Sequence, residues 1–157
     1  MLTEERKAWF AETVRCRERA MYRTALAMLR RSAEAEDAVA DAIEAAWRRL
    51  DRLRDDKALP TYLMTCTVNA CHRALRRRRE QPVNDLTPYA PVSPPELPLW
   101  AYLTSLPEKY RLPLILRYGE EMPVEEIARV LRLPRGTVST RLSRGLKQLR
   151  KQIGEGG

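Results

Sequence analysis

Apolar side chains in the first part of the chain recur every three or four residues, the spacing of one face of an α-helix. The first such run follows Thr3, a residue type that often caps helix N-termini, and Glu4 and Glu5 then stand where the helix dipole favours anions. Its apolar positions are Trp9, Phe10, Val14, Met21, Leu26, Met28 and Leu29. The pattern predicts a long first helix that begins after Thr3.

Two more helices are predicted before residue 80. Ser32 can cap the second one, and acidic residues follow in its first turns. The predicted inner face of this helix consists of Val39, Ile43, Trp47 and Leu50. Residues 52–59 break the periodicity, which indicates a loop. A third helix is predicted from Pro60 to about Arg79, because proline is favoured in the first turn of a helix.

Prolines separate this part of the chain from the rest. They stand at positions 82, 88, 91, 94, 95 and 98, where each removes a backbone donor and prevents a continuous helix. Residues 1–80 and 99–157 each carry a net charge of +5, whereas residues 81–98 carry −2. We therefore predict an all-α protein with two small helical domains, residues 1–80 and 99–153, joined by a flexible proline-rich linker, residues 81–98.

Short helical patterns follow the linker. Pro107 opens a segment that Gly119 can end, and the next apolar pattern is VEEIARVL, residues 124–131. A basic helix without acidic residues is then predicted from Pro134 to Gln152. The last two helices match a helix-turn-helix, in which the turn consists of Arg132 and Leu133.

The helix-turn-helix pattern predicts which side chains face inward. In the first helix these are Ile127, Ala128 and Leu131, and in the second Val138, Leu142, Leu146 and Leu149. Ala128 is small, as the close crossing of two helices requires. Arg132 stands where many such turns have glycine, and a positive φ there would cost roughly 1 kcal/mol.

The outer face of the basic helix is the candidate DNA-reading surface. Its members are Arg135, Thr137, Ser139, Thr140, Arg141, Ser143, Arg144 and Lys147. Short Ser139, Thr140 and Ser143 let the backbone approach base edges, and Arg144 can bind guanine with its two-pronged guanidinium. Arg135, Arg141 and Lys147 suit phosphates. The alternative is an amphipathic helix whose polar face is simply solvated. The absence of acidic residues on the basic face argues against this alternative.

Two stretches carry a resemblance to a known family. SLPEKYRLPLILRYGEEMPVEEIARVLRLPRGTVSTRLSRGLKQLRK closely resembles region 4 of the sigma-70 family of bacterial RNA polymerase sigma factors, and AEDAVADAIEAAWRRLDRLRDDKALPTYLMTCTVNACHRALRRRR resembles region 2. Their order and the short chain are typical of the extracytoplasmic-function group. The resemblance implies a dissociable subunit of core RNA polymerase that is monomeric when free. Its expected partners are promoter DNA, the largest-subunit coiled coil, the polymerase flap and an anti-sigma factor.

The resemblance also implies roles within residues 1–80. Region 4 would read the −35 element, whereas region 2 would bind polymerase and open the −10 element. The polymerase-binding candidates are Asp37, Ala40, Asp41 and Glu44, three of which form an acidic row, although the family often has Gln near Ala40. The −10 candidates are Arg54, Lys57, Thr61, Tyr62, Thr65, Asn69, Arg73, Arg76 and Arg77. A flipped base would enter a pocket made by residues 54–59 and Asn69. Ordinary surface charge remains an alternative for the acidic row, and a solvated helix end for the arginines.

No catalytic constellation, cofactor site or metal site is predicted. Cys66 and Cys71 fall among apolar positions and read as core residues, while His72 reads as a surface residue. The charged N-terminus has no apolar signal region, and no run approaches the ~20 apolar residues of a membrane span, so we expect a cytoplasmic protein without membrane insertion. Two alternatives stay open: a helix-turn-helix regulator that acts without polymerase docking, and an interaction protein such as an inhibitor.

Overall fold

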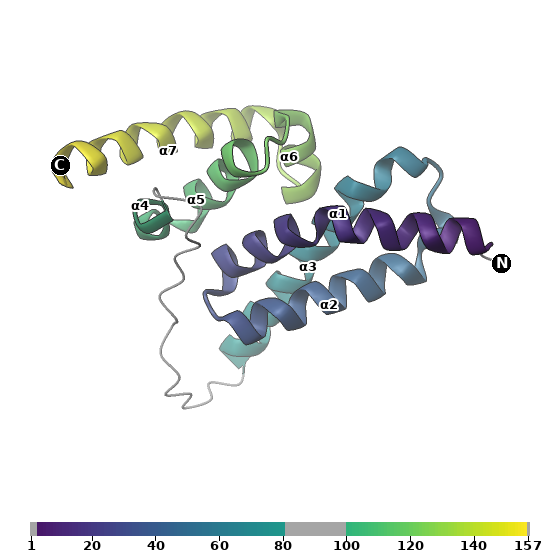
Figure 1. The fold of residues 1–157 in the computed structure, drawn as a ribbon. Coiled ribbons are helices and arrows are strands. Elements are labelled where there is room, and N and C mark those ends of the chain that lie inside the picture. Colours follow the sequence, from purple (N-terminus) through teal and green to yellow (C-terminus); the bar gives the residue numbers. More distant parts are fainter. Residues whose placement is uncertain (1–2, 81–99, 157) are drawn as a thin grey trace. The chain divides into compact units, whose positions relative to one another are not determined.

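The computed structural model describes residues 3–80 and 100–156, and these form two compact helical units (Figure 1). No strand occurs in these two ranges, so the predicted all-α class is confirmed. The predicted linker lies outside the described residues, and its flexibility stays a prediction. No helix in the described ranges is long and apolar enough to cross a membrane.

The first unit consists of three helices that pack along one another: α1 (Glu4–Leu29), α2 (Ser32–Arg48) and α3 (Leu59–Glu80). Two short 3-10 turns, η1 (Leu50–Arg52) and η2 (Asp56–Ala58), connect α2 to α3. The predicted cap of the first helix is confirmed, because the Thr3 hydroxyl accepts a hydrogen bond from the Arg6 backbone N–H at 3.1 Å. The third helix begins and ends within one residue of its predicted bounds.

The start of α2 differs from the prediction. Ser32 is the first helical residue rather than the cap, and Arg31 takes the cap position without a side-chain cap bond. The Ser32 hydroxyl instead lies 2.8 Å from the hydroxyl of Tyr22 on α1. The hydroxyl of Ser32, which the local pattern predicts as a helix cap, therefore binds a residue of another helix instead.

The inner face of α2 was predicted only in part, because Val39 and Leu50 are buried as expected but Ile43 and Trp47 are not. Its buried side chains are Ala35, Ala38, Val39, Ala42 and Ala46, whereas Ile43 is half-buried and Trp47 is 38% exposed. A row of alanines lets α2 approach its neighbours closely, and this leaves no room for an indole in the middle of the contact. Trp47 lies at the margin, where its ring and the ring of Phe10 make a T-shaped contact with centroids 5.2 Å apart. Leu50 is buried, but it lies in η1 beyond the helix.

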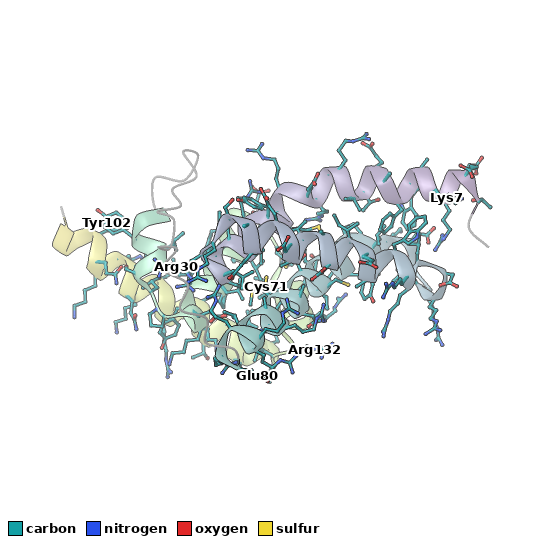
Figure 2. The ribbon with its side chains drawn as sticks, turned by 90° about the horizontal axis from the view of Figure 1, so that it is seen from below. Lys7, Arg30, Cys71, Glu80, Tyr102 and Arg132 are labelled. Carbon is teal, nitrogen blue, oxygen red and sulfur yellow. The ribbon has the colours of Figure 1, made fainter. Side chains whose placement is uncertain are left out.

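The core of the first unit includes the two cysteines of α3. Cys66 and Cys71 are both buried, as predicted, and Figure 2 labels Cys71. None of the chain's three cysteines forms a disulfide, and Cys16 is exposed on α1. His72 is exposed, which confirms its prediction as a surface residue.

The second unit contains α4 (Trp100–Ser105), α5 (Glu108–Leu114), η3 (Ile115–Gly119), α6 (Val124–Leu131) and α7 (Arg135–Gly156). Pro107 occupies the position before α5 and so opens the segment, and the wider π-turn η3 ends at Gly119, both as predicted. The helix-turn-helix is present as α6 and α7. Arg132 closes α6 with φ 56° and ψ 47°, so the expected positive φ is confirmed.

At Gly145, α7 comes very close to α5. No other glycine in the described ranges has such near neighbours. A Cβ atom at this position would lie 3.2 Å from Cβ of Tyr110 and 3.0 Å from Cδ1 of Leu114. The small residue at the tight crossing is therefore Gly145. Ala128, which was predicted for that role, is only half-buried, and Val130 takes the buried position beside Ile127.

Candidate nucleic-acid and polymerase interfaces

Side chains on one side of α7 form the first candidate surface, the α7 face. Arg135, Ser139, Thr140, Ser143, Arg144 and Lys147 are exposed, while Thr137 and Arg141 are half-buried. Buried Val138, Leu142 and Leu149 fix the rotation of the helix, whereas Leu146 is half-buried. The arrangement presents hydroxyls and guanidinium groups together along the first four turns, a set of donors that suits base edges and phosphates.

One basic member of the α7 face has an acidic partner. A guanidinium nitrogen of Arg135 lies 3.0 Å from a carboxylate oxygen of Glu125 on α6. The expectation that no acid pairs with the basic face is therefore wrong at this position. The basic helix itself contains no acid up to Ile153, but the fold brings one from the preceding helix.

A second candidate surface, the α3 stripe, runs along the third helix. Thr61, Tyr62, Thr65 and Asn69 are half-buried at its start, and Arg73, Arg76 and Arg77 are exposed toward its end. The Thr65 hydroxyl donates a 3.2 Å hydrogen bond to the carbonyl of Thr61, which orients that side chain along the helix. The α3 stripe therefore has neutral polar side chains at the start of the helix and cationic side chains toward its end.

The four consecutive arginines at the end of α3 do not have one role. Arg76, Arg77 and Arg79 are exposed, whereas Arg78 is half-buried. One nitrogen of Arg78 donates to the carbonyl of Leu29 at 3.1 Å and to the carboxylate of Glu34. Arg78 therefore joins α3 to the end of α1 and the start of α2, which is a structural role.

A tyrosine, a cysteine and an arginine meet at the α3 stripe. The Tyr62 hydroxyl lies near the Cys66 thiol and near the guanidinium of Arg49, the residue that follows α2, and both groups act on its pKa. Burial raises the pKa of Tyr62, and the neighbouring Cys66 raises it further. Burial also raises the pKa of Cys66, against the opposing effects of the Tyr62 hydrogen bond, Arg49 and Arg73. The thiol is therefore protonated at neutral pH and is a weak nucleophile.

Arg49 is a candidate that sequence reasoning missed. It is exposed and lies near the side chain of Tyr62, so it adds a cation from the end of α2 to the α3 stripe. The linear sequence places it 13 positions before Tyr62, and only the return of the chain through η1 and η2 brings the two together. No local motif signals such a pair.

The segment between α2 and α3 presents two of the predicted cations. Arg54 and Lys57 are exposed. The carboxylate of Asp55 accepts a 3.0 Å hydrogen bond from the backbone N–H of Lys57, and this cap begins η2. Asn69 is half-buried in the middle of α3, ten residues after the segment ends at Leu59.

The acidic row on α2 is exposed, together with Ala40. Asp37, Asp41 and Glu44 fall on one side of the helix because they are spaced by four and three residues. Glu44 pairs with Arg48 at 2.5 Å, one turn further along. Among the described residues, no group of three or more His, Cys, Asp or Glu side chains is placed to hold a metal ion.

Comparisons with known proteins agree with this architecture. Residues 13–81 match the family described as Sigma-70 region 2, and residues 96–149 match Sigma-70, region 4. The chain is 29% identical to the ECF RNA polymerase sigma factor SigW of Bacillus subtilis, over 92% of this chain and 88% of that protein. It is also 29% identical to the RNA polymerase sigma-E factor of Streptomyces coelicolor, over 92% of this chain and 85% of that protein.

A solved structure shares the fold. The sigma factor RpoE, crystallised in complex with the anti-sigma factor NepR from Bartonella quintana, aligns with a TM-score of 0.76 at 23% identity. The alignment covers 92% of this chain and 96% of RpoE. The two helical units and their sequence matches define a bacterial sigma factor. The chain belongs to the sigma-70 family, in its extracytoplasmic-function group.

Proposed function

We propose that this protein binds core RNA polymerase and directs promoter-specific transcription initiation, with the α7 face on the −35 element and the α3 stripe on the −10 element. The observation that carries the proposal is the exposed α7 face on a helix-turn-helix within a chain of this family. A helix so placed fits a major groove about 12 Å wide. The chain acts as a specificity subunit without catalytic residues of its own, in the cytoplasm.

The division of labour follows from the chemistry of each surface. Arg144 suits guanine, and Arg135, Arg141 and Lys147 suit phosphates. The α3 stripe, with Arg54 and Lys57 from the preceding segment, would hold a separated strand and a flipped base. The acidic row would bind basic groups on the coiled coil of the largest polymerase subunit. The relative crystallised with NepR supports an anti-sigma factor as a further partner.

Run-off transcription with core polymerase tests the proposal directly. The protein should yield a product from its own promoter class that core enzyme alone does not yield. Absence of any promoter-specific product, with a holoenzyme that has formed, would contradict the proposed function. Binding to promoter DNA without association with core polymerase would instead support a regulator that acts alone.

The roles within the α7 face can be separated by two substitutions. Arg144→Ala should relax −35 specificity and weaken binding to the preferred sequence by ~1–3 kcal/mol, because a base contact is lost. Lys147→Ala should weaken binding evenly on all sequences, because phosphates carry no sequence information. Equal losses on every sequence for both variants would contradict this division.

A further inference from the structure

Arg6, on the first turns of α1, contacts the segment between α2 and α3 at two points. Its Nη1 donates to Oδ1 of Asp56 at 2.9 Å, and its Nη2 donates to the carbonyl of Leu50 at 3.1 Å. The guanidinium carbon also lies 5.1 Å from the centre of the Trp9 ring. In Figure 1 this segment passes beside the N-terminal part of α1.

These contacts differ from an ordinary surface ion pair, which contributes little to stability. The planar guanidinium binds two acceptors six residues apart while it lies against an aromatic ring, and its side chain is 27% exposed although that of Asp56 is 61% exposed. Its shape makes both bonds possible at once, and an ammonium group lacks this fixed fork. Leu50 belongs to η1 and Asp56 to η2, so a single side chain fixes the two turns relative to α1.

The segment that Arg6 holds carries the cations assigned to the −10 element. Arg54 lies between the two anchored residues, and Lys57 directly follows Asp56. The ion pair also compensates the charge of Asp56, which would otherwise repel a phosphate approaching Lys57. Arg6 therefore acts on both the position and the charge of this segment.

We propose that Arg6 is a positioning residue for recognition of the −10 element, which it serves by holding residues 50–58 against α1. The inference rests on the proposed function, because it requires that Arg54 and Lys57 meet promoter DNA. The N-terminal turns of α1 would then influence promoter selectivity without contacting DNA themselves.

The test uses holoenzyme and the promoter fragment that gives the run-off product, with its −10 positions randomised and its −35 element fixed. Arg6→Met keeps the apolar stem and removes both hydrogen bonds. Its selectivity among −10 sequences should fall about tenfold, the scale of one well-recognised base pair, while −35 binding and polymerase affinity change less than about twofold. The matched control is Arg15→Met, an exposed arginine on the same helix that pairs only locally with Glu12 at 2.7 Å.

A charge exchange separates positioning from general support of the fold. Arg6→Asp should lose −10 selectivity, and Arg6→Asp combined with Asp56→Arg should recover part of it, because the ion pair is restored in reverse. Unchanged selectivity in Arg6→Met, or a loss that merely follows the melting temperature and polymerase affinity, would overturn the inference.

Direct substitutions distinguish this failure from failure of the proposed function. Arg54→Ala with Lys57→Ala should change −10 selectivity if these residues meet DNA. When this double variant changes selectivity but Arg6→Met does not, only the role of Arg6 is refuted. When neither changes it, the assignment of the segment to the −10 element is refuted, and the inference about Arg6 with it.

Discussion

Arg132 holds a backbone conformation that glycine adopts most readily, with φ 56° at the turn of the helix-turn-helix. Replacing it with glycine should raise the free energy of unfolding of the second unit by up to about 1 kcal/mol, because the strain of the Cβ atom is removed. Urea denaturation followed by circular dichroism measures this change.

The control for Arg132 lies three residues earlier. Arg129 is exposed within α6, where glycine is a poor helix former, so Arg129→Gly should lower stability by up to about 1 kcal/mol. A fall in stability for both variants would show that the side chain of Arg132 contributes more than its backbone strain costs.

Cysteine reactivity follows from burial and pKa. Cys66 is buried and its pKa is raised above the ordinary value of 9.0, whereas Cys16 is exposed. At pH 7.5 the thiol of Cys66 is protonated, and its fraction of thiolate grows only as the pH rises through and beyond 9. Iodoacetamide labelling read by peptide mass spectrometry should therefore modify Cys16 well before Cys66.

Unfolded protein provides the control for this labelling. In denaturant Cys16 and Cys66 should react at similar rates, since burial no longer acts on either. Rapid labelling of Cys66 in the native protein at pH 7.5 would contradict its burial.

At the scale of the element, the consecutive arginines that end α3 differ in role although they are identical in sequence. Arg78→Ala should lower the free energy of unfolding of the first unit by about 1–3 kcal/mol, because the Leu29 carbonyl and Glu34 lose a charged donor. Arg79→Ala should change it by less than about 0.5 kcal/mol, because Arg79 is exposed. Thermal and urea denaturation compare the two, and similar losses for both would refute the separate role of Arg78.

The helices themselves were largely predictable from the sequence, because spacing, caps and prolines act locally. The Thr3 cap, the Pro107 start and the Gly119 end all depend on nearest neighbours along the chain. The face of α2 was not predictable, since periodicity does not reveal that a row of alanines packs more closely than one containing Trp47. The need for a glycine at position 145 likewise arises only from Tyr110 and Leu114, which lie on another helix.

The candidate sites divide in the same way. Exposure of most of the α7 face follows from the helical period, which the sequence displays. The contact of Arg49 with Tyr62 and the pairing of Arg135 with Glu125 each join residues on different elements. Such pairs depend on the path of the connecting turns, which no local pattern encodes.

At the scale of the whole molecule, the surfaces proposed for polymerase and for the −35 element lie in different helical units, the acidic row in the first and the α7 face in the second. Replacing Asp37 and Asp41 with arginine should weaken binding to core polymerase by about tenfold or more, because like charges then meet. Binding of the −35 element by the α7 face should remain, since the substitutions lie in the other unit. Surface plasmon resonance with core enzyme, and gel shift with promoter DNA, measure the two separately.

A matched charge reversal controls for the added positive charge. Glu12→Arg with Glu18→Arg makes the same change in net charge at exposed positions on α1. This variant should bind polymerase about as well as the original protein. Equal weakening by both pairs would indicate a general effect of charge rather than docking through the acidic row.

In the ion pair between Glu125 and Arg135, a carboxylate of the helix-turn-helix neutralises one of its own cations. In the proposed −35 contact, Arg135 would turn to a phosphate and the DNA would release a cation, while Glu125 would lose its partner and attract a cation from solution. The net release of ions would then be smaller than the number of basic contacts implies, so promoter affinity would fall less steeply with salt. Glu125→Gln should therefore steepen the fall of promoter affinity with salt, which would show that this carboxylate makes binding less sensitive to ionic strength.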